Sequence, residues 1–303
     1  MTGREPAVRT VLGDIPGDEL GICDAHDHLF LRSPLLAGQE LDDPGDAARR
    51  LRAFRDLGGG TVVQWTPHGM GRRAEDLVAL SRATGVRLVA ATGLHQARHY
   101  GAGTLDGLPE DLAGLFTTEL TEGIAGTGIR AGLIKVAGDF HGLDAHARRT
   151  LSAAARAHHR TGAPVAVHLE QGTAALEVLD LLCGEEGMAP GRVVLGHLGR
   201  FPDHVTHREA ARAGAYLAFD GPSRAHHATD WRLPGELAEL AGAGFADRLL
   251  LGGDTTVPGT PGMPFLLGGL RARLELTLGA GLVERILTAN PARAFATVWT
   301  DPG

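Results

Sequence analysis

The chain has 303 residues, of which 43% are hydrophobic and 21% are charged, and this composition predicts a globular protein. Its net charge of −7, with basic residues scattered along the chain, argues against a nucleic-acid-binding surface. No apolar stretch approaches the roughly 20 residues of a membrane-spanning helix, so we expect no membrane association. Cys23 and Cys183 stand far apart without a CxxC motif, and residues 1–20 contain no apolar segment typical of a signal peptide. We therefore expect a cytoplasmic location.

Short apolar segments, each followed by a helical pattern, recur between residues 20 and 279. Runs rich in Val, Ile and Leu and bounded by glycine or polar residues predict strands that are buried on both faces. The predicted strands cover 20–28, 60–66, 86–93, 131–138, 163–170, 192–199, 215–221 and 248–254. Helical periodicity predicts helices over 43–57, 72–84, 107–125, 143–161, 172–187, 204–213, 234–244 and 264–279.

The repeated strand–helix unit predicts an α/β protein built as a (β/α)8 TIM barrel, a fold that takes about 250 residues. A doubly wound open sheet is the alternative, but eight units in one chain favour closure of the sheet. Residues 7–20 predict a short N-terminal strand pair across the barrel floor, and 281–299 predict a C-terminal closing helix. No linker or low-complexity segment divides the chain, so we expect one domain over residues 1–303.

The ends of the predicted strands carry histidine, lysine and aspartate side chains. The active site of a TIM barrel lies at the C-terminal ends of its strands, so these side chains should meet there. His26 and His28 are two residues apart and therefore point to the same side of the first strand. Four histidines and a carboxylate form a ligand set suited to zinc, manganese, cobalt or iron. The candidate ligands, about enough for two ions, are His26, His28, Lys135, His168, His197 and Asp254.

Lys135 is the single lysine of the chain, and the other 28 of its 29 basic residues are arginines. It lies inside a predicted buried strand, where an ammonium group is costly and the amine pKa should fall below its ordinary value of about 10.4. A neutral amine can add carbon dioxide and become an anionic carbamate with an oxygen for each of two cations. Arginine cannot do this, because its guanidinium stays protonated. The alternative is a Schiff base between Lys135 and a carbonyl substrate, which would leave the histidines unexplained.

Seven motifs occur in chain order, and five of them contain these residues. In this combination they make the chain resemble the phosphotriesterase family of the amidohydrolase superfamily, over about residues 10–298. The motifs are "TVLGDIPGDELGICDAHDHLF" (10–30), "TPHGMGR" (66–72), "AGLIKV" (131–136), "APVAVHLEQG" (163–172), "VVLGHLG" (193–199), "LLLGGDT" (249–255) and "NPARAF" (290–295).

The resemblance implies a binuclear metal centre with a hydroxide between the two ions. It implies one ion bound by His26, His28, carboxylated Lys135 and Asp254, and a second bound by Lys135, His168 and His197. Two cations lower the pKa of a shared water to near neutral, and Asp254 is the best candidate to accept the proton of that hydroxide. Relatives are often homodimers, so we expect a homodimer by the same resemblance.

Other polar residues near the strand ends are weaker candidates. Arg224, His95 and Asp220 are predicted to contact substrate, and Asp220 or Asp203 to serve as a proton relay for Asp254. Relatives often carry an acidic residue just after the sixth-strand histidine, but this chain has Leu198, Gly199 and Arg200 there. A surface position is expected for two further histidines near the start of the helix 204–213, His204 and His207.

Together these features predict a metal-dependent hydrolase of an ester-like bond in a small molecule, either a carboxylic ester, a lactone or a phosphoester. Zinc is the first choice of metal, with carbon dioxide bound as the lysine carbamate. Two alternatives stay open: a Schiff-base lyase acting through Lys135, and a metal-containing binding protein without turnover.

Overall fold

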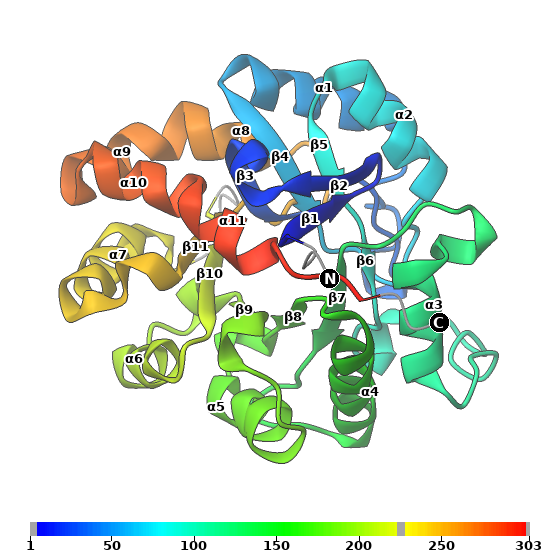
Figure 1. Cartoon of the computed structure of the whole chain (residues 1–303). Helices are drawn as coiled ribbons and strands as arrows, with labels where there is room; N and C mark the ends of the chain where they lie inside the picture. Colours follow the sequence, from blue (N-terminus) through cyan, green and yellow to red (C-terminus); the bar gives the residue numbers. More distant parts are fainter. Residues whose placement is uncertain (1–4, 223–227, 301–303) are drawn as a thin grey trace.

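The strands form a closed parallel barrel surrounded by helices (Figure 1). The computed structural model of the chain describes residues 5–222 and 228–300. Successive strands lie side by side in chain order, and the third strand is interrupted at Ala90 into two short pieces. The barrel strands are β3 (Ile22–Asp27), β4 (Gly59–Gln64), β5 (Arg87–Val89), β6 (Ala91–Thr92), β7 (Leu133–Ala137), β8 (Val165–His168), β9 (Val193–Gly196), β10 (Tyr216–Asp220) and β11 (Leu249–Gly252). The TIM-barrel prediction is confirmed.

When β5 and β6 are counted as one interrupted strand, each barrel strand is followed by at least one helix that packs on the outside of the barrel (Figure 1). Helix ends follow ordinary capping chemistry: Asp144 accepts a hydrogen bond from the amide of Ala147, and Gly162 ends the same helix in a left-handed conformation. The helices are α1 (Pro44–Asp56), α2 (Ala74–Thr84), α3 (Leu112–Thr121), α4 (Ala145–Thr161), α5 (Ala175–Leu179), α6 (His204–Ala213), α7 (Leu233–Leu240), α8 (Gly262–Phe265), α9 (Arg271–Leu278), α10 (Ala280–Leu287) and α11 (Ala289–Phe295).

Several predicted helices are shorter or more interrupted than their patterns indicate. The helix predicted over 107–125 begins at Leu112, because the carboxylate of Asp111 caps it and Pro109 precedes it. The helix predicted over 172–187 begins at Ala175 and widens into a π-helical turn over Asp180–Glu185. Two further predictions are divided: 264–279 into α8 and α9, and the closing helix 281–299 into α10 and α11.

The N-terminal end of the barrel is closed by a hairpin and a helix. Strands β1 (Ala7–Thr10) and β2 (Gly13–Pro16) pair in antiparallel register, as predicted, and a short 3-10 turn (Gly17–Leu20) leads into β3. Helix α11 packs against this turn and against β1. The barrel interior above them is filled by small and aliphatic side chains together with Trp65 and Tyr216, while Val8, Leu20 and Phe295 seal the floor. This packed floor leaves the opposite end of the barrel for polar chemistry.

Among the described residues, every helix is too short or too polar to traverse a lipid bilayer.

Candidate metal centre

The predicted ligands meet at the C-terminal end of the barrel, although they are up to 228 residues apart in sequence, from His26 to Asp254. They border one cavity of about 510 Å³, a size suited to a small-molecule ligand. His26 and Lys135 lie within strands, and His168 ends its strand. His28 and His197 come directly after the last residue of their strands, and Asp254 comes two residues after the end of β11. Further lining residues are Leu35, Leu36, His95, Arg98, His99, Glu170, Arg200 and Thr256.

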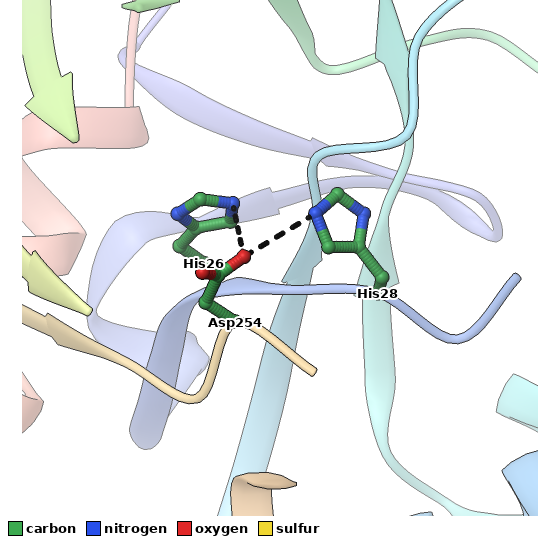
Figure 2. A group of neighbouring side chains, drawn as sticks. All are labelled: His26, His28 and Asp254. Carbon is green, nitrogen blue, oxygen red and sulfur yellow. Dashed lines mark ion pairs between the residues drawn. The ribbon is translucent and has the colours of Figure 1, made fainter. Parts of the chain in front are cut away.

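Asp254 faces the two histidines of the first barrel strand (Figure 2). Its Oδ1 lies 3.6 Å from Nε2 of His26 and 3.6 Å from Nε2 of His28. These distances exceed that of a good hydrogen bond. They are close to the separation of about 3.3 Å between two ligand atoms of a tetrahedral zinc ion with bonds of about 2.0–2.1 Å. The three buried side chains therefore fit around a divalent cation.

Asp254 is held in place by backbone hydrogen bonds across the seam between β11 and β3. Its own amide donates to the carbonyl of His26 at 2.9 Å. The amides on either side of it, from Gly253 and Thr255, donate to the carboxylates of Asp24 and Asp27. Its φ of 45° is uncommon for a residue other than glycine, and this network of hydrogen bonds supports it. Asp24 and Asp27 thus position the carboxylate of Asp254 at the cavity, a role that the sequence motif did not reveal.

Asp220 sets the orientation of two imidazoles from behind. Its carboxylate accepts a hydrogen bond from Nδ1 of His26 at 2.7 Å and another from Nδ1 of His197. With the proton on Nδ1, each ring directs an unprotonated Nε2 toward the cavity, as a metal ligand requires. The ring of His26 also stacks on Trp65, with 3.7 Å between ring centroids. Burial alone would raise the pKa of Asp220, but its electrostatic contact and hydrogen bond with His26, the charge of Arg200 and a hydrogen bond from the His197 amide bring it below its ordinary value.

Thr66 fixes the tautomer of His28, as Asp220 does for His26 and His197. Nδ1 of His28 lies 2.8 Å from the Thr66 hydroxyl oxygen, and that hydroxyl donates its single proton to the carbonyl of Phe30 at 2.6 Å. The hydroxyl can therefore only accept from His28, whose proton is on Nδ1. Nε2 of His28 is left with a lone pair that points toward Asp254.

His168 and His197 point toward each other in a way that neutral imidazoles alone do not favour. Nε2 of His168 donates to Glu170 at 3.2 Å, and Nδ1 of His197 donates to Asp220. The remaining atoms, Nδ1 of His168 and Nε2 of His197, lie only 2.7 Å apart. Burial lowers the pKa of His168 to about 4 and lowers that of His197 well below its ordinary value, so both rings are neutral near pH 7. A shared proton or a cation is needed between these two lone pairs.

Lys135 lies in the middle of β7, 1% exposed, beside β8. Within the described part of the chain no carboxylate lies within 4.0 Å of its Nζ, and it donates no hydrogen bond. Burial lowers the pKa of this amine to about 7, against the opposing charge of Asp254. A substantial fraction of the amine is therefore neutral at physiological pH. The backbone of Lys135 also packs against Gly93. A Cβ added to Gly93 would lie only 2.0 Å from the carbonyl oxygen of Lys135, so this close contact requires glycine.

Arg200 is a pocket residue that the sequence did not identify as one. Its guanidinium donates to Oδ2 of Asp254, the oxygen that faces away from His28. It stands three residues after His197, within the stretch where relatives often carry an acid. Asp203, the nearest acid in sequence, instead caps α6 by accepting from the amides of Val205 and Thr206. The one available signal was that Arg200 stands close in sequence to His197, a predicted ligand at a strand end.

The remaining predicted residues have different positions. His95 lines the cavity, with its ring centroid 4.5 Å from that of His168, and burial lowers its pKa. The carboxylate of Asp220 lies behind the imidazoles and does not line the cavity. Arg224 lies outside the described residues. Arg98 also borders the cavity and pairs with Glu170 at 2.6 Å.

A larger groove of about 1090 Å³ lies at the opposite end of the barrel, between β2 and α11. It contains none of the candidate ligands, and the chemistry described above is confined to the smaller cavity.

Comparison with known proteins places these features in a family. The sequence model of the Phosphotriesterase family matches residues 6–270. A "phosphotriesterase homology protein" from Mycobacterium tuberculosis is 35% identical, over 71% of this chain and 70% of its own length. A "phospho-furanose lactonase" from Mycoplasmopsis synoviae is 30% identical, over 80% of this chain and 74% of its own. Among solved structures, a lactonase from Listeria monocytogenes superposes with a TM-score of 0.89 at 27% identity, covering 95% of this chain and 98% of that one.

Proposed function

Because this chain belongs to the phosphotriesterase family, we propose that it hydrolyses an ester-like bond with two divalent cations bound at the barrel mouth. One observation carries the proposal: six side chains from distant strands direct lone pairs or carboxylate oxygens into one cavity, with outer acceptors fixing the tautomers. The chemistry of these donors suits zinc first, and manganese, cobalt or iron as well. When bound, such cations would acidify a water and polarise the oxygen of the bond under attack.

The residues divide into two ligand groups around Lys135. One cation would be held by His26, His28 and Asp254. The distance of 3.6 Å from Oδ1 of Asp254 to Nε2 of each histidine favours this group. His168 and His197 would hold the other, since a cation between Nδ1 and Nε2 would remove the conflict of two facing lone pairs. Lys135 would contribute to both groups.

Lys135 reaches this role by carboxylation. The neutral Nζ attacks carbon dioxide, an N–C bond forms, and the nitrogen loses a proton to solvent. The product is a carbamate that carries one negative charge and two oxygens. Support comes from the burial of the amine, from its lowered pKa and from the absence of a carboxylate partner for Nζ in the described part of the chain.

Asp254 is the residue that we assign to proton transfer. Its Oδ1 faces the cavity and can accept the proton that the attacking water loses, while Arg200 holds Oδ2. This charge-assisted contact also restrains the carboxylate from rotating away from the cavity. Arg200 is therefore a positioning residue for this step.

A lactone is the first substrate class that we propose. Two of the similar proteins reported above are named lactonases, and the cavity of about 510 Å³ accommodates a small cyclic ester. Leu35 and Leu36 supply an apolar wall, and Arg98 supplies a positive charge at the rim. Carboxylic esters and phosphoesters are the further classes to assay.

The test is a hydrolysis panel of lactones, carboxylic esters and phosphotriesters with zinc- or manganese-loaded protein. We expect turnover that disappears after chelation and returns with metal. Lys135→Ala should lose activity at least about a hundredfold and regain part of it with added short carboxylates, which can occupy the place of the carbamate. Lys135→Arg, which carries a permanent positive charge and cannot be carboxylated, should stay inactive under the same addition.

Three outcomes would contradict this proposal. Turnover by metal-free protein would remove the metal mechanism. Borohydride trapping of a carbonyl substrate on Lys135 would favour the Schiff-base lyase. Failure on the whole panel, despite full metal occupancy, would favour a binding protein without turnover.

A further inference from the structure

His95 presents an N–H group to the cavity at the barrel mouth, where the candidate ligands present lone pairs. Its ring lines the cavity beside His168, with 4.5 Å between the ring centroids. Nδ1 of His95 accepts a hydrogen bond from the amide of Gln96 at 2.7 Å. Because an amide N–H can only donate, this ring nitrogen carries no proton. The proton of the His95 ring is therefore on Nε2.

The Nε2–H group is the one polar group of His95 that has no acceptor within the described part of the chain. The amide of His95 donates to the hydroxyl oxygen of Tyr100 at 2.8 Å, and its carbonyl accepts from Nε2 of His146 at 2.8 Å. Nε2 of His95 forms no hydrogen bond with a described residue, and it is not among the buried polar atoms that lack a partner. It is therefore open to the cavity, on a ring whose orientation is fixed before a ligand binds.

His99 adds a second N–H group beside the first. Its ring also lines the cavity, and its centroid lies 4.1 Å from that of His95. Nδ1 of His99 lies 3.0 Å from the hydroxyl oxygen of Ser33, which already accepts from the amide of Leu35. Among the described residues, this ring nitrogen is the acceptor available to the hydroxyl proton, so Nδ1 of His99 accepts and its Nε2 carries the proton.

Both rings are uncharged near pH 7. Burial lowers the pKa of His95 well below its ordinary value and lowers the pKa of His99 to about 3. A neutral imidazole is a very weak acid, so each Nε2–H donates a hydrogen bond without transferring its proton. Two arginines that border the cavity, Arg98 and Arg200, are already paired with carboxylates. The unpaired neutral donors therefore favour an uncharged oxygen acceptor, such as a hydroxyl group.

We propose that His95 and His99 determine substrate specificity by donating hydrogen bonds from Nε2 to a hydroxyl oxygen of a hydroxylated lactone. This inference rests on the proposed hydrolysis and narrows its first substrate class. A lactone with a hydroxyl substituent offers the two N–H groups an acceptor, whereas an alkyl lactone of the same ring size leaves them without one. A site built to hydrogen-bond a substrate hydroxyl discriminates against the analogue that lacks it.

The test compares kcat/KM for γ-butyrolactone with kcat/KM for its α-hydroxy and β-hydroxy derivatives, using zinc-loaded full-length protein. The preference for at least one hydroxylated lactone should fall about 5- to 10-fold in His95→Asn, as expected for the loss of one neutral hydrogen bond. Because the preference is a ratio, differences in the intrinsic reactivity of the lactones cancel between wild type and variant.

The choice of side chain separates the N–H donor from the rest of the ring. In His95→Asn, an amide oxygen can still accept from Gln96, but no donor occupies the position of Nε2. In His95→Gln, the longer side chain can place an amide N–H near that position and should restore part of the preference. His159→Asn, at an exposed histidine of α4, is the matched control and should keep the wild-type preference.

His99→Asn is a second variant at a partly exposed position, where substitution carries less risk to folding. It should lower the preference in the same direction as His95→Asn. Equal preference in wild type and in folded His95→Asn and His99→Asn would overturn the inference. Continued hydrolysis of the three lactones in that case would leave the proposed function intact.

The tautomer of His95 gives a readout that does not require turnover. Heteronuclear NMR of protein labelled with isotopic nitrogen in its histidines measures it, and the signal is assigned by its loss in His95→Asn. We expect the proton on Nε2, and a shift of this signal on addition of a hydroxylated lactone that γ-butyrolactone does not produce. A proton on Nδ1, or equal shifts with all three lactones, would contradict the inference. Absence of lactone turnover would contradict the proposed function instead.

Discussion

At the residue scale, the outer hydrogen-bond partners of the imidazoles decide what the barrel mouth can bind. Asp220, Thr66 and Glu170 each take a ring proton, so that the inward nitrogens stay available for a cation. The histidines themselves could be predicted from the sequence, because strand ends of a barrel meet at one mouth. Their partners could not, because Asp220 reaches two rings only through the curvature of the closed sheet.

Asp220→Asn tests this arrangement. An amide can still accept from one ring but carries no charge, so zinc affinity and turnover should each fall by about 10- to 100-fold. Zinc titration with a competing chelator and steady-state kinetics measure the two effects. Asp180→Asn, an exposed aspartate after α5, is the control. Unchanged zinc affinity in Asp220→Asn would show that Asp220 does not tune the ligands.

At the element scale, the apolar runs located every barrel strand, because strands buried on both faces must be apolar throughout. Helix ends were predicted less well. Helix caps such as Asp111, and interruptions such as the π-helical turn at Asp180–Glu185, depend on local side chains and are not revealed by the spacing of apolar residues.

Helix α3 is also fixed by a buried ion pair, since the Arg72 guanidinium donates to both carboxylate oxygens of Glu119.

Glu119→Gln should destabilise the fold by about 3–5 kcal/mol at pH 7, because it leaves Arg72 buried without a counter-charge. Burial alone would raise the pKa of Glu119, but hydrogen bonds from His68 and Arg72 and the charge of Arg72 lower it from 4.5 to about 2. Folding therefore lowers this pKa, and the stabilisation is full above about pH 4.5 and is lost as the pH falls toward about 2.

Urea unfolding at pH 7 and at pH 3 measures this dependence. The difference in unfolding free energy between wild type and Glu119→Gln should narrow at pH 3, whereas Glu122→Gln, an exposed control at the end of α3, should differ little from wild type at either pH. A difference that does not change with pH would contradict the ionised state of Glu119.

At the scale of the whole molecule, the barrel separates stability from chemistry. The hairpin β1–β2 and α11 pack the floor with apolar side chains, and the polar side chains collect at the opposite end. This division could be predicted from the strand-end motifs. The burial of His207 against Glu236 could not, because it depends on how two helices that are separate in sequence pack together. Homodimer formation, a cytoplasmic location and a single domain stay predictions.

Phe295→Ala tests the division. Removing this fully buried ring from the floor should cost about 3–5 kcal/mol of stability, while turnover per folded molecule should stay within about twofold of wild type. Thermal unfolding and kinetics at a temperature where the variant is folded measure the two quantities. Leu276→Ala, at a side chain 89% exposed on α9, should change neither. A large loss of turnover in folded Phe295→Ala would mean that the floor shapes the metal centre.

The carboxylated Lys135 between two cations is the central claim, and anomalous X-ray diffraction at the zinc absorption edge from crystals of zinc-loaded protein tests it most directly. We predict two anomalous peaks in the barrel mouth, one beside His26 and His28 and one beside His168 and His197, with electron density for a carboxylate on Nζ of Lys135. An unmodified Nζ in a map of zinc-saturated protein, with no peak between His168 and His197, would contradict the account.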